Sequence, residues 1–242
     1  MNTGVAKIVT VANQVDRLIL DSGEEVQADV VLSSAGLPET YALCSPQPKL
    51  EKPVSAGRLA FAETISIFKD QPKSFGWGDD TIVFFNARER FSYREASDLV
   101  DLTSGVICIP NNFQFGDEQM AEGVVRLTCL SNYDKWKSYG ESEYAEQKEL
   151  WRPRIWSAAK KFMPATGLGY DGACIAHDMF TPTTVERYTW RKQGAIYGAP
   201  QKSKDGTTPI SNLFICGTDQ GFLGIVGSML SGIAMANTHA LR

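Results

Sequence analysis

The residues best suited to chemistry lie near the C-terminus, where a short apolar run leads into a glycine-rich turn. Residues 212–216 are typical of a strand, and Gly217, Thr218 and Asp219 follow as a turn. Gly217 lets the backbone pass close to a ligand, and Asp219 can accept hydrogen bonds from sugar hydroxyls. Free N–H groups near Gly224 can face a phosphate or a carbonyl group. The spacing equally allows a second interpretation, in which these small residues serve helix packing alone.

A literal G-x-G-x-x-G pattern occupies residues 167–172. In dinucleotide-binding loops a strand precedes this pattern and a helix follows it, so that the pyrophosphate meets a helix N-terminus. Here residues 160–163 look like a helix end, Pro164 precedes the glycines, and Pro182 follows soon after. We therefore interpret the run as a loop rather than a phosphate site.

Other chemistry-bearing residues form no clear constellation. No Ser/His/Asp or Cys/His arrangement supports nucleophilic catalysis, so the catalytic residues stay unassigned, and His177 is either a lone proton donor or a structural residue. Five scattered cysteines without a CxxC pair, together with only two histidines, predict reduced thiols and no metal site. Arg187 and Tyr188 can contact a substrate or cofactor, although a structural ion pair explains Arg187 equally well.

The first elements along the chain read as a β-meander. Strands are expected at residues 5–11, 15–20 and 26–32, with glycine available for the second turn. A run of small residues follows at 33–36, where backbone can approach a neighbour. Prolines between residues 46 and 53 then mark a linker or domain crossing.

A second sheet and two helices are expected downstream. Strand-like runs at residues 59–68, 81–86, 105–110 and 123–130 predict a mixed or antiparallel sheet. Residues 141–162 predict an amphipathic helix that Pro153 kinks or restarts. Residues 180–184 predict a loop. A helix over 225–241 ends the chain. Six aromatic side chains can line an apolar tunnel or pack in the core, as most large aromatics do. They are Phe61, Phe84, Phe85, Trp136, Trp156 and Trp190.

Composition narrows the class of protein. Apolar residues make up 43% of the 242 residues, which predicts a buried core, and the net charge of −4 without a basic cluster argues against nucleic acid as a partner. Residues 220–241 are uncharged if His239 is neutral. Their polar residues and glycines make the stretch only mildly apolar, so a membrane anchor is the less favoured interpretation.

Three blocks of the sequence resemble the C-terminal portion of phytoene-desaturase-like flavoproteins, within the amine-oxidase-like superfamily. This group includes carotenoid desaturases, carotenoid isomerases and retinol saturases. The first block runs from Val5 to Gly36. The second, T-P-T-T-V-E-R-Y-T followed by G-A-I-Y-G, spans residues 181–198 and is the most specific, and the third spans residues 217–232. The chain departs from the family's frequent Pro-Gly in the final turn, where it has Gln220-Gly221. It also lacks the family's N-terminal strand–GxGxxG–helix unit.

The resemblance implies an α/β fold, formed by part of an FAD-binding lobe and a mixed-sheet substrate domain. Residues 1–45 would belong to the FAD lobe, residues 46–200 to the substrate domain, and residues 201–242 to the final FAD-contacting strand and helix. The implied cofactor is FAD, and the implied contacts are Val5, Gly217, Thr218, Asp219, Gly224, Ile225, Val226 and Ser228. Weaker implied substrate contacts are Arg187, Tyr188 and Tyr197.

The implied activity is hydride transfer between a flavin and an apolar, isoprenoid or carotenoid-like small molecule. The fragment alone is expected to be inactive, because a separate N-terminal FAD-binding chain or a longer product would supply the rest of the cofactor site. We expect a cytoplasmic protein, with peripheral contact at the inner face of a membrane left open. The alternative function is a non-catalytic module of the same architecture that binds prenyl groups or lipids.

Overall fold

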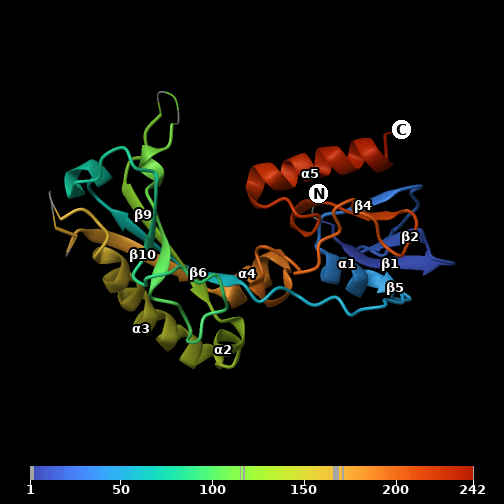
Figure 1. The fold of residues 1–242 in the computed structure, drawn as a ribbon, viewed down its shortest axis with the longest axis horizontal. Helices are drawn as coiled ribbons and strands as arrows, with labels where there is room; N and C mark the ends of the chain where they lie inside the picture. Colours follow the sequence, from blue (N-terminus) through green and yellow to red (C-terminus); the bar gives the residue numbers. More distant parts are fainter. Residues whose placement is uncertain (1–2, 115, 117, 166–168, 171, 242) are drawn as a thin grey trace. The chain divides into compact units, whose positions relative to one another are not determined.

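The computed structural model describes residues 3–114, 116, 118–165, 169–170 and 172–241. The chain divides into two units (Figure 1). Unit 1 comprises Met1–Gly57 and Glu186–Arg242, and unit 2 comprises Arg58–Val185. Unit 2 is therefore inserted, in sequence, between the two segments that build unit 1.

Unit 1 contains the predicted meander. Its first sheet has the order β3-β2-β1-β5, and its strands are β1 (Val5–Val11), β2 (Gln14–Leu20), β3 (Glu25–Val26) and β5 (Cys44–Ser45). The meander strands are antiparallel, whereas β5 pairs in parallel with β1. Ala12 and Asn13 adopt positive φ in the tight turn between β1 and β2, which suits the right-handed twist of a hairpin. One face packs through Ile8 and Val15 against Leu213.

A second, two-stranded sheet in unit 1 joins its two sequence segments. Strand β4 (Val31–Ser33) pairs in parallel with β11 (Leu213–Ile215). The single strand expected over residues 26–32 was wrong, because it is split into β3 and β4, which belong to different sheets. Exposed residues 27–29 separate the two strands and let the chain change sheets.

The helices of unit 1 follow these strands. They are α1 (Leu37–Leu43), α5 (Gly224–His239) and the short 3₁₀ turns η3 (Lys192–Gly194) and η4 (Gly217–Asp219). Helix α4 (Pro182–Thr189) contains the division between the units. The loop expected at residues 180–184 was wrong except at Thr181, because Phe180 ends β10 and residues 182–184 belong to α4. Pro182 is the first residue of α4, a position where the missing N–H costs nothing and the fixed φ suits a helix.

Unit 2 contains a five-stranded antiparallel sheet with the order β10-β6-β9-β8-β7. Four of its strands were predicted and one, β10, was not; they are β6 (Ala60–Phe68), β7 (Ile82–Asn86), β8 (Ser104–Cys108), β9 (Gly123–Ser131) and β10 (Cys174–Phe180). Most of β10 is exposed, so its sequence lacks the apolar alternation that reveals a half-buried strand.

Two helices and two 3₁₀ turns complete unit 2: α2 (Tyr133–Lys137), α3 (Glu141–Lys160), η1 (Pro72–Phe75) and η2 (Pro110–Asn112). Helix α3 runs along one face of the sheet (Figure 1). It buries Trp151, Ile155 and Ala159, which confirms the predicted apolar stripe. The helix continues through Pro153 as one element, so of the two predicted alternatives, a kink or a restart, the restart does not occur.

Side chains along β6 alternate between the two faces of this sheet. Ala62 and Phe68 belong to the core that includes Trp151 and Ile155, so residues of even number face α3. Residues of odd number, such as Glu63, therefore face the opposite side.

In the described part of the chain, no helix combines the length and the hydrophobicity that crossing a bilayer requires.

Candidate functional site

The turn after β11 is clamped to helix α5. Gly217 has a φ of +84°, and its N–H donates a hydrogen bond of 2.6 Å to the hydroxyl of Ser231 on α5. That hydroxyl in turn donates to Oε1 of Gln220 at 2.5 Å. Burial raises the pKa of the adjacent Cys216 thiol, which keeps it neutral. One buried serine thus fixes both ends of the turn.

Asp219, at the end of this turn, is fully buried. Its Oδ2 accepts a hydrogen bond of 2.6 Å from the backbone N–H of Leu37, the first residue of α1. Its Oδ1 accepts one of 2.8 Å from the N–H of Ala199. Because Gly36 at the N-cap of α1 has no side chain to offer, Asp219 supplies the acceptor that caps this helix.

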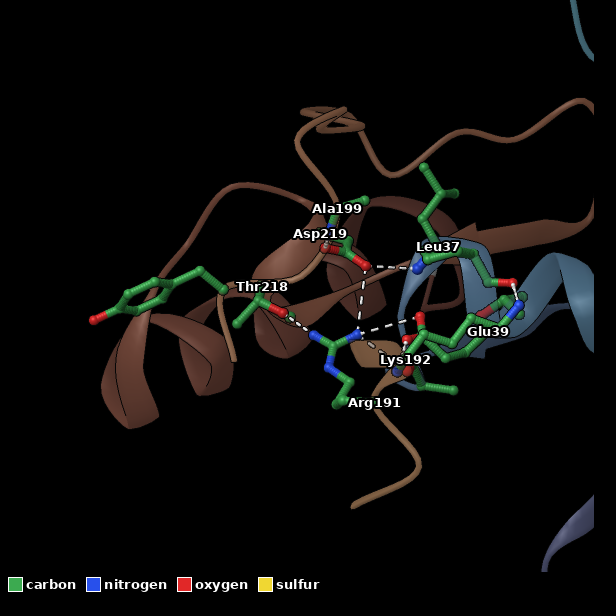
Figure 2. A network of polar contacts seen from close by, with 12 residues as sticks. Leu37, Glu39, Arg191, Lys192, Ala199, Thr218 and Asp219 are labelled. Carbon is green, nitrogen blue, oxygen red and sulfur yellow. Dashed lines mark hydrogen bonds and ion pairs between the residues drawn. The ribbon is translucent and has the colours of Figure 1, made fainter. Parts of the chain in front are cut away.

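Arg191 connects Asp219 to a second carboxylate (Figure 2). Its Nη1 lies 3.4 Å from Oδ2 of Asp219 and 3.7 Å from Oε2 of Glu39. The same nitrogen donates to the carbonyl of Ala35 at 3.1 Å, and Nη2 donates to the hydroxyl of Thr218. Glu39 also accepts a hydrogen bond of 2.8 Å from the N–H of Lys192. The guanidinium thereby joins α1 to the turn before α5.

Lys202 provides the second positive charge. Its Nζ lies 3.4 Å from Oδ1 of Asp219 and donates to the carbonyls of Tyr197 and Thr218 at 2.6 and 3.0 Å. The two cations, Arg191 and Lys202, balance the carboxylates of Asp219 and Glu39. Buried charges are tolerated when they are paired and hydrogen-bonded in this way.

Two glycines leave the space that these charges need. A Cβ on Gly198, whose φ is +67°, would lie 1.8 Å from Oδ1 of Asp219. A Cβ on Gly36, whose φ is +110°, would lie 1.8 Å from Nη1 of Arg191. Both positions therefore require glycine for conformation and for space.

The N-terminus of α5 is open. Leu223 at the N-cap provides no side-chain cap, and Gly224 is exposed. A Cβ added at Gly217 or Gly224 would meet no atom within 4 Å. The start of α5 at Gly224 thus borders free space, and the first-turn N–H groups of a helix are the donors that an acceptor group of a ligand requires.

One face of α5 is apolar and exposed. Ile225 is 83% exposed, and the exposed apolar side chains recur at helical spacing; they are Ile225, Val226, Met229, Leu230 and Ile233. Only Ser231 and Met235 are buried among the described residues of this helix. A contiguous exposed apolar face of this kind normally marks a surface that binds a protein, a ligand or a membrane.

The remaining predicted site residues lie apart from this turn in the sequence. Val5 begins β1 and is partly exposed, and Ser228 is half-buried on α5. Arg187 and Tyr188 are exposed neighbours on α4, where the guanidinium lies 5.5 Å from the ring centre. Tyr197 contributes its carbonyl to Lys202.

In unit 2, the sheet face opposite α3 carries a charged pair. Arg126 Nε lies 2.6 Å from Oε1 of Glu63, and the hydroxyl of Thr128 donates to Oε2 at 2.7 Å. The strand register places Glu63, Thr128, Val106 and Phe84 in one row, and Phe84 is 80% exposed. The row thus combines a buried carboxylate with exposed apolar surface.

The aromatic candidates divide between core and surface. Phe85 and Trp136 are buried, as the core interpretation predicts, whereas Phe84 and Trp190 are exposed. His177, on β10, has its Nε2 3.9 Å from Oε2 of Glu149. The glycine pattern at residues 167–172 lies partly outside the described residues.

Sequence reasoning missed Glu39, Arg191 and Lys202. They stand far apart along the chain, and no spacing rule joins them to Asp219 or to one another. The available signal was the pair of glycines, Gly36 and Gly198, in loops that could hold backbone close to another group.

The fold is similar to that of solved oxidoreductases. The match with an oxidoreductase from Methanosarcina mazei covers 97% of this chain and 49% of the oxidoreductase chain, at 13% identity and a TM-score of 0.54. The match with a putrescine oxidase variant, from a redesign of cofactor binding, covers 98% of this chain and 48% of the oxidase chain, at 14% identity and a TM-score of 0.57.

This chain spans about half the length of those proteins. At such identities the likeness shows the fold alone, and it confirms the predicted mixed α/β class. No family model matches the sequence, and no curated protein matches it.

Proposed function

We propose that this chain forms the C-terminal part of an FAD-dependent oxidoreductase, in which unit 1 contributes one wall of the cofactor site. The observation that carries the proposal is the open N-terminus of α5, set after a glycine turn and flanked by exposed apolar side chains. The fold similarity to oxidoreductases that are about twice as long supports it. So does the sequence resemblance to phytoene-desaturase-like flavoproteins.

The residues around α5 fit a flavin. Gly217 and Gly224 leave open space, and the first-turn backbone N–H groups of α5 that begin at Gly224 suit the carbonyl and phosphate oxygens of FAD. Ile225 and Val226 offer apolar surface for the ring system. Thr218 and Ser228 lie in the same segment, and Val5 would contact the adenine end. When bound, FAD supplies hydride transfer.

Asp219 has a positioning role in this proposal. Its carboxylate has no exposed surface, and both oxygens accept hydrogen bonds from within the chain. Through Arg191 and Lys202 it fixes the turn that leads into α5, the helix whose first-turn N–H groups would face the cofactor. A rigid turn keeps those donors in place without reorganisation.

The proposed substrate is an apolar, isoprenoid-like molecule, with chemistry of the desaturase or saturase type. The exposed apolar side chains of Ile82 and Phe84 in unit 2 support an apolar substrate surface. On the same face, the Glu63–Arg126 pair offers a fixed polar point that can orient one end of a long molecule. Such a substrate would bring the protein into peripheral contact with a membrane.

The test is co-expression of the chain with the reading frame immediately upstream of it, followed by purification and absorption spectroscopy. We expect the pair to copurify as a yellow protein with a flavin spectrum, and the chain alone to retain little flavin. A pair that copurifies without flavin, and takes up none on incubation with FAD, would overturn the proposal. That outcome would favour a lipid-binding module.

A further inference from the structure

Strand β7 (Ile82–Asn86) is an edge of the unit 2 sheet, and among the described strands it pairs with β8 alone. The N–H of Ala87 donates to the carbonyl of Thr103 at 2.7 Å, and the register is regular from there through the whole strand. Because bonding residues alternate in an antiparallel pair, the odd-numbered residues of β7 bond to β8. The backbone groups of the even-numbered residues point outward; these residues are Ile82, Phe84 and Asn86.

The outward edge of β7 is apolar. Phe84 is 80% and Ile82 is 48% exposed, and no residue of the strand is charged or a proline. An edge strand of this kind is a template for another strand, because its outward N–H and carbonyl groups have no strand partner. Strand β7 thus offers both main-chain groups and apolar surface to a partner.

The opposite edge of the same sheet is protected. Strand β10 contains the charged Asp178, and its register with β6 shifts between Cys174 and Ala176. A charged side chain and an irregular register are two of the devices by which sheets prevent edge-to-edge pairing. Strand β7 has neither of them. Of the two edges, β7 is therefore the one suited to accept a further strand.

A second copy of β7 fits this edge. In an antiparallel arrangement with Phe84 opposite Phe84 of the second copy, Ile82 lies opposite Asn86, and the full length of both strands is aligned. Each pair of outward residues then exchanges two main-chain hydrogen bonds. A shift by two residues keeps the outward groups face to face but leaves the strand ends unpaired. The strand is thus self-complementary about Phe84, as a two-fold interface requires.

The charges beside the strand favour the same orientation. Residues 79–80 are both aspartate, and residues 88–90 are Arg-Glu-Arg. Antiparallel pairing brings the acidic start of each strand beside the more basic end of the other, whereas parallel pairing would place like charges together. Within the chain, Asp79 also pairs with Lys73 at 3.6 Å and Arg88 with Asp101 at 3.5 Å. The charges therefore select the orientation, and the strand pairing supplies the affinity.

We propose that this chain forms a two-fold symmetric dimer through β7, in which the sheets of two copies join as one continuous sheet. The main chain supplies the hydrogen bonds, and the two Phe84 side chains meet at the symmetry axis on the face opposite α3. The pairing strand belongs to unit 2, and the inference does not depend on the flavin proposal.

The first test is the mass of the full 242-residue chain, measured by sedimentation velocity. At a chain concentration of about 100 µM we expect a dimer of twice 26.6 kDa, which dissociates on dilution because the pairing strand is short. A chain that stays a monomer at this concentration would overturn the proposal and leave the edge to a strand of another protein.

Variants locate the interface. Phe84→Lys should make the chain a monomer, because two lysines would meet at the axis and charged side chains block edge pairing. Ile175→Lys is the matched control: it makes the same type of change at an exposed apolar residue of β10, and should leave the dimer intact. Both side chains are exposed, so both variants should keep the urea midpoint of the parent chain. If the two variants dimerise alike, the interface lies elsewhere and the proposal is wrong.

Disulfide trapping tests the register, and it keeps the proposal falsifiable if Phe84→Lys does not fold. Cys174→Ser first removes the exposed native thiol. In that background Phe84→Cys should form a covalent dimer on mild oxidation, because opposite hydrogen-bonded residues have Cα atoms about 5.5 Å apart, within disulfide range. Ile82→Cys is the control, since its two copies would lie four residues, or about 13 Å, apart along the strands. Equal cross-linking of the two variants on a non-reducing gel, or none in Phe84→Cys, would contradict the pairing.

Discussion

The carboxylate of Asp219 accepts a hydrogen bond of 2.6 Å from the backbone N–H of Leu37, a residue 182 positions earlier in the chain. This contact joins the start of α1 to the turn before α5, so the two segments of unit 1 share one buried charge. Arg191 and Lys202 neutralise that charge from two sides.

Replacing Asp219 with Asn should destabilise the protein strongly. The substitution leaves Arg191 and Lys202 short of one negative charge, and an amide N–H₂ must face the N–H of Leu37 or Ala199. We expect a loss of about 3 kcal/mol in the free energy of unfolding, in the range typical of broken buried pairs. Urea denaturation measures it. The control, Asp21→Asn, alters an exposed aspartate that accepts from Gly4, and should cost less than about 0.5 kcal/mol.

Gly198→Ala should lower the free energy of unfolding more than an alanine replacement at another glycine with the same backbone strain. Gly198 and Gly23 both have positive φ, so each alanine variant should lose about 1 kcal/mol from conformation alone. At Gly198 the new methyl would also collide with Asp219, whereas at Gly23 nothing lies within 4 Å. We expect a total loss of about 3 kcal/mol for Gly198→Ala. Equal urea midpoints for the two variants would argue against the packing described.

Cys129 should make the protein sensitive to alkali. Burial raises the pKa of its thiol from 9.0 to about 12. The unfolded chain therefore releases this proton at a lower pH than the folded chain does. The resulting stabilisation is present below pH 9 and is lost as the pH rises from about 9 towards 12.

The measurement is the free energy of unfolding at a series of pH values in reducing buffer. Between pH 8 and 11 it should fall less steeply in Cys129→Ala than in the parent chain, because other groups titrate in both proteins alike. Parallel curves would contradict the burial of this thiol. In the native state at pH 8, Cys129 should resist iodoacetamide, while the exposed Cys174 should react.

The apolar face of α5 should matter for flavin retention and not for folding. Met229 is exposed, so Met229→Lys should change the free energy of unfolding of the isolated chain by less than about 0.5 kcal/mol. In the co-expressed pair the same variant should lose most of the bound flavin. Thr238→Lys adds the same charge at an exposed position elsewhere on the helix, and the pair that carries it should retain the bound flavin. Absorption spectroscopy of the two purified pairs measures the difference.

Much of the fold follows from local patterns in the sequence. Strand β1 begins and ends at the residues predicted, and α3 was located from the spacing of Trp151, Ile155 and Ala159. Both elements have one buried and one exposed side, which is the arrangement that periodicity detects. Strand β10 was not predicted, because five of its seven residues are exposed and its sequence therefore shows no apolar alternation.

The candidate site was predictable only in part. The strand–turn–helix around Gly217 shows in the sequence because glycines and an apolar run adjoin there. The partners of Asp219 do not show, because Leu37, Arg191 and Ala199 meet it only after the chain has folded over long separations. The open conformation of the α5 N-terminus likewise depends on which atoms surround it, and local sequence does not encode that.

The pairing of β4 with β11 also determines when this protein can fold during its synthesis. Strand β4 has left the ribosome long before residue 213 is translated, and it must wait for its partner while all of Arg58–Val185 emerges. All strands of the inserted unit have been synthesised once Phe180 is translated, so this unit can fold first. An early stop codon before β11 would therefore leave a folded insert flanked by an unpaired, aggregation-prone N-terminal segment.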